Sequence, residues 1–145
     1  MATDPYQAGM FKKDPYFKKK DCAGELCVVL DGSFESRALQ LMVPPSRAFL
    51  AGDIHELIVT DEQEAGPGRE VNRIAYWGFF EVSDASVVVA GDEITVGGKC
   101  AGRIAGFDET HMPNHLNVVI RAAERVSGAE LGLALGDKVR IVKKA

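Results

Sequence analysis

The hexapeptide GDEITV (Gly91 to Val96) carries the clearest structural signal in this chain, because a turn and a strand follow each other directly. Glycine readily adopts a positive φ and aspartate caps a turn, so Gly-Asp is a tight entry into the run behind it. Alternating apolar residues in that run indicate a strand with one buried face. The same device recurs at Gly52-Asp53-Ile54 and at Gly136 to Ile141. Three uses of it predict a compact closed sheet.

Short runs rich in valine and isoleucine follow one another along the chain, with Gly or Asp-Gly between them. This pattern is typical of a β-barrel or sandwich. The predicted strands are Leu26 to Leu30, Arg37 to Val43, Ile54 to Thr60, Val71 to Val82, Ser86 to Ala90, Glu93 to Val96, Lys99 to Phe107, His115 to Arg121 and Lys138 to Lys143. The first two are expected to form a hairpin. One helical turn is expected between Ala122 and Leu135, so the predicted fold is all-β, a small closed β-barrel.

The chain is predicted to have one domain with an extended arm before it. A length of 145 residues with 46% hydrophobic content is enough for one buried core. Residues 1–22 instead hold two Asp-Pro-Tyr units and several lysines, and proline disfavours a helix there. We therefore expect an extended basic arm at 1–22 and a single β-barrel domain at 23–145. The arm is expected to lie over the barrel or a neighbour, so a homo-oligomer through it is one hypothesis.

Composition argues against several classes of function. The formal net charge of −4 predicts no nucleic-acid partner. No apolar run approaches the roughly 20 residues of a membrane span, so no membrane contact is expected. The three cysteines show no CxxC spacing, which favours a reduced cytoplasmic protein without a disulfide framework or zinc ribbon. There is no glycine-rich phosphate loop or dinucleotide fingerprint, so no redox cofactor is expected.

The segment from Phe107 to Asn117 is the densest in groups that can move protons or bind metal, with two histidines, two carboxylates and two asparagines. Met112-Pro113-Asn114 predicts a turn that folds His111 and Asp108 back over the next strand. In that strand Leu116, Val118 and Ile120 are expected to face the core. His115, Asn117 and Arg121 are expected to share the opposite face.

Acid/base chemistry is the first interpretation of this segment. Imidazole titrates near neutral pH, so His111 or His115 could transfer a proton with Asp108 or Glu109 orienting the ring. The predicted catalytic residues are therefore His111, His115 and Asp108. The predicted substrate-binding residues are Asn117, Arg121, Asn114, Glu109, Tyr76 and Trp77. The predicted ligand is a small molecule, with no cofactor.

Two other interpretations of the same segment stay open. In one, His55, His111 and His115 together bind a divalent metal. In the other, the segment is a polar corner, where Asp108, Asn114 and Asn117 satisfy turn backbone and the histidines are only partly buried.

The aromatic run at residues 76–80 could form the floor of a ligand pocket or part of the barrel core. Strict alternation places Tyr76 and Phe80 on one face and Trp77 and Phe79 on the other. The acidic loop at residues 61–70 is expected to be flexible and exposed.

Four segments carry a resemblance to a known family: LIVTDEQEAGPGRE (Leu57 to Glu70), AGDEITVGGKCAGRIAG (Ala90 to Gly106), HLNVVI (His115 to Ile120) and LGDKVRIV (Leu135 to Val142). Over rather more than half its length the chain resembles the glucitol/sorbitol-specific enzyme IIA components of the bacterial sugar phosphotransferase system. The resemblance implies a small β-barrel that accepts a phosphoryl group on a histidine within a His-x-His-Gly element.

The element that matches His-x-His-Gly is Ala75-Tyr76-Trp77-Gly78, which keeps the glycine and has neither histidine. A phosphoryl acceptor needs a nucleophilic nitrogen, so the resemblance implies the barrel without the carrier reaction. His115 matches the family's later histidine, which opens the strand after the loop.

The sequence therefore predicts a small-molecule enzyme or ligand-binding barrel that uses histidine acid/base chemistry, of lyase, isomerase or hydrolase type. The alternatives are a phosphocarrier-like protein without its acceptor and a protein-interaction module.

Overall fold

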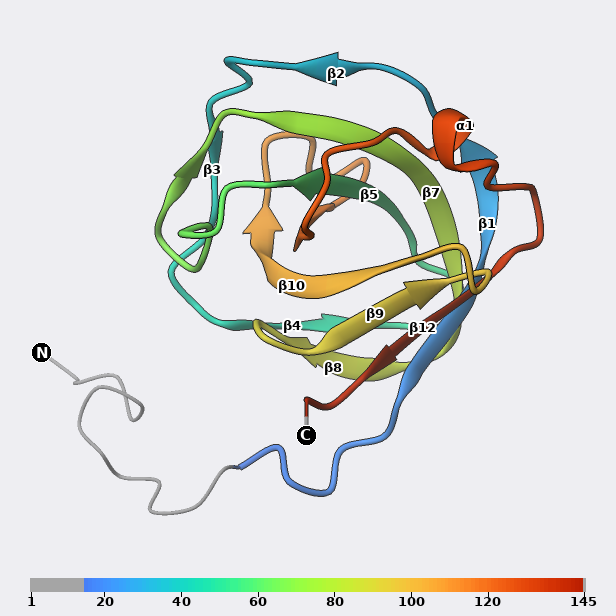
Figure 1. Cartoon of the computed structure of the whole chain (residues 1–145). Helices are drawn as coiled ribbons and strands as arrows, with labels where there is room; N and C mark the ends of the chain where they lie inside the picture. The colour runs from blue at the N-terminus through green and yellow to red at the C-terminus, as the bar shows by residue number, and fades with distance from the viewer. Residues whose placement is uncertain (1–14, 145) are drawn as a thin grey trace, which may run out of the picture.

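The computed structural model describes residues 15–144, which form a mostly β structure with one short helix (Figure 1). The predicted β-rich fold with a short helical element near the C-terminus is confirmed. Most of the predicted basic arm, at residues 1–14, lies outside the described residues, as does the oligomer contact predicted for it.

Six strands are at least five residues long: β1 (Cys22–Val29), β5 (Ile54–Thr60), β7 (Ile74–Asp84), β10 (Cys100–Asp108), β11 (Asn117–Arg121) and β12 (Lys138–Val142). The shorter strands are β2 (Ser33–Phe34), β3 (Leu39–Gln40), β4 (Ser46–Phe49), β6 (Glu70–Val71), β8 (Ser86–Val89) and β9 (Glu93–Val96). The predicted strands at 54–60 and 93–96 agree with β5 and β9 to the residue. Strands β2 and β4 were not predicted, because neither short segment shows a clear apolar alternation.

Seven strands hydrogen-bond in a continuous ring of pairs. Their order is β1, β12, β9, β10, β11, β5 and β7, and β7 pairs with β1 again. Each pair is antiparallel except β11 with β5, which is parallel. The ring depends on β7, whose 11 residues curve round the molecule and reach both β5 and β1 (Figure 1).

The three Gly-Asp elements are tight turns, as predicted. Gly52, Gly91 and Gly136 have φ values of 92°, 98° and 84°. Each following aspartate accepts a hydrogen bond from the backbone N–H three residues before it: Leu50 to Asp53 at 2.8 Å, Val89 to Asp92 at 2.9 Å and Ala134 to Asp137 at 2.9 Å. The turns lead into β5, β9 and β12.

The ring strands separate two hydrophobic clusters. Every ring strand contributes to the larger one, the inner cluster, which includes Leu57, Trp77, Phe80, Val118 and Ile120. The smaller, outer cluster lies on the opposite face of β5 and β11 and consists of Leu39, Leu41, Ile58, Ala65, Val71, Ile74, Ala105 and Val119. The segment around β3 and β6, which pair with each other, covers this outer face. The same segment also covers polar residues on this face of β5, so that Glu56 and Thr60 are buried.

The predicted hairpin between the first two strands is wrong. β1 pairs with β12 and β7, while the 37–43 segment forms only the two-residue β3, which pairs with β6. The segment is apolar because Leu39 and Leu41 cover the sheet. A segment that covers a sheet can be as rich in apolar residues as a strand within the sheet, so sequence alone does not distinguish the two.

A β-bulge in β7 overturns the strict alternation expected for its aromatic residues. Leu57 pairs with Gly78 but Ile58 pairs with Tyr76, so Trp77 is an extra residue on β7. Trp77 and Phe80 consequently both lie in the inner cluster. Tyr76 packs against the outer cluster instead.

The only helix among residues 15–144 is α1 (Gly128–Leu131), inside the predicted interval. Ser127 caps its first turn by accepting a hydrogen bond from the Glu130 N–H at 3.3 Å. A Cβ at Gly128 would lie 2.0 Å from the Trp77 carbonyl oxygen, so glycine lets α1 approach β7. No helix in the described part of the chain has the length and apolar character required to cross a bilayer.

Candidate functional site

The Asp108 to Asn117 segment forms a turn that brings two imidazole rings together. The His111 carbonyl accepts hydrogen bonds from the backbone N–H groups of Asn114 and His115, at 2.9 and 3.3 Å. The Met112-Pro113 peptide bond within this turn is cis. The ring centroids of His111 and His115 are 5.1 Å apart with an interplanar angle of 34°. The predicted corner therefore places the two rings side by side.

His115 is held by both of its ring nitrogens. The Asn114 side-chain amide donates to Nδ1 at 2.8 Å, so the ring proton lies on Nε2, which donates to Glu56 Oε1 at 3.1 Å. Both partners of this pair are nearly enclosed, with side chains 12% and 10% exposed. The Phe79 ring meets the imidazole edge-on, at 4.9 Å between centroids. These contacts fix the orientation of the His115 ring.

Glu56 is a functional candidate that sequence reasoning missed. It lies on β5 directly beside Asn117 of the parallel strand β11. Its signal was a carboxylate in the middle of the apolar run IHELIVT. Burying a carboxylate is costly unless it is paired, and the imidazole of His115 supplies the partner.

His111 is exposed and is held by Arg37, a second residue that the sequence did not single out. Arg37 Nη2 lies 3.2 Å from His111 Nε2, and Arg37 Nε donates to the Tyr76 hydroxyl at 3.3 Å. A guanidinium can only donate, so Nε2 of His111 accepts and its proton is on Nδ1. Arg37, Glu56, Tyr76, His111 and His115 together are called the histidine corner below.

The backbone beside Arg37 is in an unusual conformation. Ala38 has a φ of 55°, in the left-handed region that residues with a Cβ rarely adopt. Asn72 secures it: its carbonyl accepts from the Arg37 N–H at 3.0 Å, and its side-chain oxygen accepts from the Ala38 N–H at 3.0 Å. Such conformations persist where the surroundings enforce them, often at functional sites. Here the result is a fixed backbone at the base of the Arg37 side chain.

Asp108 does not orient a histidine, which corrects its predicted role. It is 1% exposed and accepts hydrogen bonds from the Gln40 N–H, the Thr110 N–H and the Asn117 amide, at 3.0, 2.9 and 3.1 Å. These bonds tie the β3 segment and the turn to β11. Asp108 therefore has the role that the polar-corner interpretation gave it, since it bonds to turn backbone. The Asn117 amide bonds to Asp108 and not to the turn backbone, and Glu56 is the carboxylate at the histidines.

The other predicted site residues are divided between the corner and more distant positions. Tyr76 and Asn114 belong with the histidines. Glu109 points to Arg47, at 2.6 Å. Trp77 lies in the inner cluster and donates to the Val126 carbonyl at 3.1 Å. Arg121 is at the opposite end of β11 from Asn117, so it is not part of this site.

The three histidines do not form the alternative metal site. His55 faces the inner side beside Phe49, with 4.7 Å between ring centroids, and its Nδ1 accepts from the Leu116 N–H at 3.4 Å. Burial lowers the pKa of His55, against the opposing influence of Asp53. Among residues 15–144, no group of three or more His, Cys, Asp or Glu side chains is placed to hold a metal ion.

The acidic loop at 61–70 is more ordered than predicted. The Glu62 carboxylate accepts from the N–H groups of Asn72 and Arg73, at 2.8 and 2.6 Å, and Asp61 pairs with Arg73 at 2.8 Å. Ala65 is buried in the outer cluster. The Glu62 carboxylate and the buried Ala65 thus anchor the loop over the outer face, while most of its other residues are exposed.

Comparisons with known proteins identify a family. Neither the curated proteins nor the solved structures contain a match to this chain. A family model does match residues 16–142, which include every residue of the histidine corner. The chain belongs to that family, which is described as a family of unknown function (DUF6917).

Proposed function

We propose that this protein binds a small organic acid at the histidine corner and moves a proton to or from it through His111. One observation carries the proposal. A cationic guanidinium donates to the imidazole nitrogen of an exposed histidine, Arg37 to His111 at 3.2 Å, while a second imidazole stands 5.1 Å away. These groups come from distant parts of the sequence.

The geometry favours proton transfer next to a carboxylate. Arginine recognises carboxylates through charge-assisted hydrogen bonds. A ligand carboxylate that takes over the Arg37 donor frees His111 Nε2 and brings the adjacent carbon of the ligand close to that nitrogen. The freed nitrogen can then accept a proton as a general base. This is the chemistry of isomerases and lyases that act on organic acids, and it needs no redox cofactor.

His115 and Glu56 serve as positioning residues in this proposal. Both ring nitrogens of His115 are already bonded, so its ring forms a fixed wall beside His111. The Tyr76 hydroxyl, which Arg37 also contacts, can donate to a second ligand oxygen.

We further infer that the seven-strand ring is a closed barrel, with the histidine corner on its outer wall and not at its mouth. The return of β7 to β1 supports closure, and the contribution of every ring strand to the inner cluster supports it as well. The site lies outside because Glu56 and Tyr76 share the face of the outer cluster.

A phosphocarrier-like protein without its acceptor is the second candidate. Tyr76, from the element that matches His-x-His-Gly, contacts the Arg37 that also contacts His111. Incubation with phosphoenolpyruvate and the general phosphotransferase proteins tests this candidate. A stable phosphohistidine at His111 or His115 would show that the carrier reaction persists on another histidine, and would favour a working phosphocarrier over acid/base chemistry.

Hydrogen–deuterium exchange at carbon tests the proposed function. Acetate, lactate and succinate are incubated with the protein in D2O, and loss of the proton next to the carboxylate is followed by NMR. We expect wild type to catalyse exchange of at least one acid, and Arg37→Gln to bind that acid about tenfold more weakly. His111→Gln should bind the acid but not catalyse exchange, because the base is absent.

Arg69→Gln serves as the charge-matched control, since Arg69 is exposed and lies outside the histidine corner. Both His111→Gln and the control should keep the wild-type melting temperature. Exchange that survives in His111→Gln would refute the proposal. A large loss of stability in His111→Gln would instead assign that histidine to the polar corner.

A further inference from the structure

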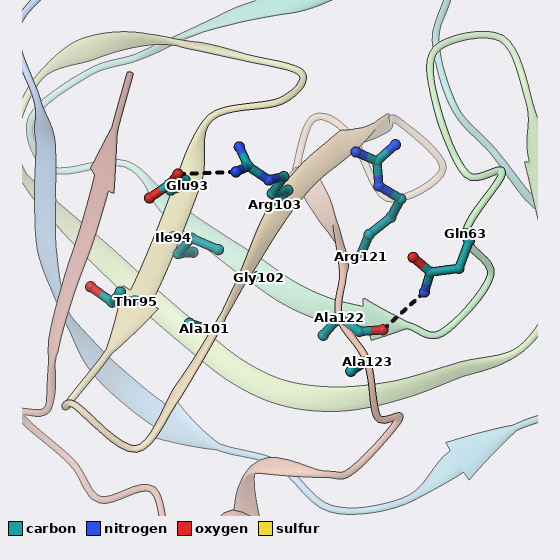
Figure 2. A pocket seen from close by; sticks show the side chains of 10 residues that line it. All are labelled: Gln63, Glu93, Ile94, Thr95, Ala101, Gly102, Arg103, Arg121, Ala122 and Ala123. Carbon is teal, nitrogen blue, oxygen red and sulfur yellow. Dashed lines mark hydrogen bonds and ion pairs between the residues drawn. The ribbon is translucent and has the colours of Figure 1, made fainter. Parts of the chain in front are cut away.

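A hollow of about 630 Å³ lies over β9, β10 and the end of β11. Figure 2 shows the residues that line it. Its lining consists of Gln63, Glu93, Ile94, Thr95, Ala101, Gly102, Arg103, Arg121, Ala122 and Ala123. Small-molecule sites typically have volumes of roughly 300–1,000 Å³, so this hollow can hold more than a simple ion. No residue of the histidine corner is among those that line it.

The hollow exists because two strands separate. The pairing of β10 with β11 ends at Arg103 and Arg121, while β10 continues to pair with β9 as far as Cys100. The lining beyond this point is formed by the small residues Ala101, Gly102, Ala122 and Ala123. Small side chains leave the space above them open.

Two arginines stand opposite each other at this point. Arg103 and Arg121 are direct cross-strand partners, and Figure 2 shows both side chains projecting on the same side of the strands. Like charges directly opposite each other on a sheet destabilise it. Arg103 is partly neutralised by Glu93, at 3.1 Å, and also donates to the Gly91 carbonyl. Arg121 donates to the Ala65 carbonyl at 3.0 Å.

The charge balance of the hollow is therefore positive in a chain whose net charge is −4. Its lining has two guanidinium groups and one carboxylate. Each guanidinium has more N–H donors than its bonds to the protein use. A bound anion would accept these donors and relieve the repulsion between the arginines.

We infer that this hollow binds the phosphate group of a small organic phosphate. A phosphate monoester carries close to two negative charges at neutral pH and three acceptor oxygens, enough for two arginines, whereas a carboxylate has one charge and two oxygens. The rest of the ligand would lie over Ala101, Gly102, Ala122 and Ala123. The Thr95 hydroxyl and the side-chain oxygen of Gln63, whose amide nitrogen is held by the Asp61 and Ala122 carbonyls, can bond its hydroxyl groups.

NMR titration with glycerol phosphate tests this inference, with the ionic strength held constant by chloride. We expect saturable shifts of the backbone amide signals of Ala101, Gly102, Ala122 and Ala123, and weaker binding of inorganic phosphate at the same positions. Arg121→Gln should weaken glycerol phosphate binding about tenfold, because a charged donor is lost. Glu93→Gln should tighten it, because a competing carboxylate is removed.

Arg121→Gln is expected to weaken binding and Glu93→Gln to tighten it. A loss of folded structure would weaken binding in both variants, so the pair separates an effect on the site from an effect on folding. Arg69→Gln, which removes a charge elsewhere, should bind as wild type does. Absent shifts in wild type, unchanged binding in Arg121→Gln or weaker binding in Glu93→Gln would overturn the inference. His111→Gln should leave glycerol phosphate binding intact, so this site can fail or succeed independently of the histidine corner.

Discussion

Glu56 decides how the histidine corner is ordered, because it is a buried carboxylate with one imidazole partner. Its contact with His115 fixes the proton of that ring on Nε2. The Asn114 amide fixes the other nitrogen. Within residues 15–144 the exposed His111 ring has one hydrogen-bond partner, Arg37, so it is the ring that can respond to a ligand.

Asp108 gives the clearest prediction for a single residue. Asp108→Ala would leave the Gln40 N–H, the Thr110 N–H and the Asn117 amide without their acceptor inside the protein. Charge-assisted hydrogen bonds contribute about 1.5–3 kcal/mol each, so loss of three should lower the free energy of unfolding by at least about 4 kcal/mol in urea denaturation.

The neighbouring carboxylate is the matched control for this prediction. Glu109 is paired with Arg47 at the surface, with its side chain 51% exposed. Glu109→Ala should therefore change the free energy of unfolding by less than about 1 kcal/mol. Equal effects of the two substitutions would show that Asp108 does not hold the turn.

At the scale of elements, local signals in the sequence were reliable and long-range pairings were not. The Gly-Asp turns, strand β5 and the turn at Met112-Pro113-Asn114 follow from neighbouring residues, and each was predicted. The orientation of β11 was also predicted: Val118 and Ile120 lie in the inner cluster and Val119 in the outer one. Alternation was enough to assign these faces because β11 itself has no inserted residue; the irregularity in its pairing lies in β10, between Ile104 and Gly106.

The aromatic residues of β7 show why the rest could not be predicted. The bulge at Trp77 inserts one residue against β5, and a single insertion reverses which face the following side chains occupy. Gly78, beside the bulge, is a local signal because an isolated glycine in a strand suggests a bulge, but it does not determine which residue is inserted. Phe80 therefore joined Trp77 in the inner cluster, and Phe79 lies against His115 on the same face as Tyr76.

The composition of the site also depends on pairings that sequence does not reveal. Glu56 reaches His115 because β5 and β11 are parallel neighbours, although 59 positions separate the two residues. Arg37 reaches His111 from the segment that covers the outer face, across 74 positions. The histidines could be identified because polar and ionisable residues are concentrated in one short segment. Their partners could be identified only from the folded structure.

At the scale of the whole molecule, burial of His55 links stability to pH. Desolvation lowers the pKa of His55 in the folded protein below its ordinary value of 6.5. As the pH falls below that value, the unfolded chain takes up the proton first, so the folded state loses stability. The stabilisation of the folded state by neutral His55 is therefore fully present above pH 6.5, and it is lost as the pH falls toward the lower pKa of the folded state.

Urea denaturation at pH values from 8 to 5 measures this effect. Wild type should lose stability below pH 6.5, and His55→Phe should show a flatter profile whatever its absolute stability. The pKa values of Asp31, Glu35 and Asp137 are also lowered by their hydrogen-bond partners, but from ordinary values near 4, so their contributions are lost at lower pH. An identical slope in His55→Phe would contradict this assignment.

The most direct test of the histidine corner is the long-range 1H–15N NMR spectrum of its imidazoles at pH 8, with and without the acid that exchanges. We predict that His115 carries its proton on Nε2 and keeps it there when the acid binds. We predict that His111 carries its proton on Nδ1, and that its Nε2 signal moves when the acid takes over Arg37. A His111 spectrum that shows the Nε2–H tautomer and does not change with the acid would contradict the account.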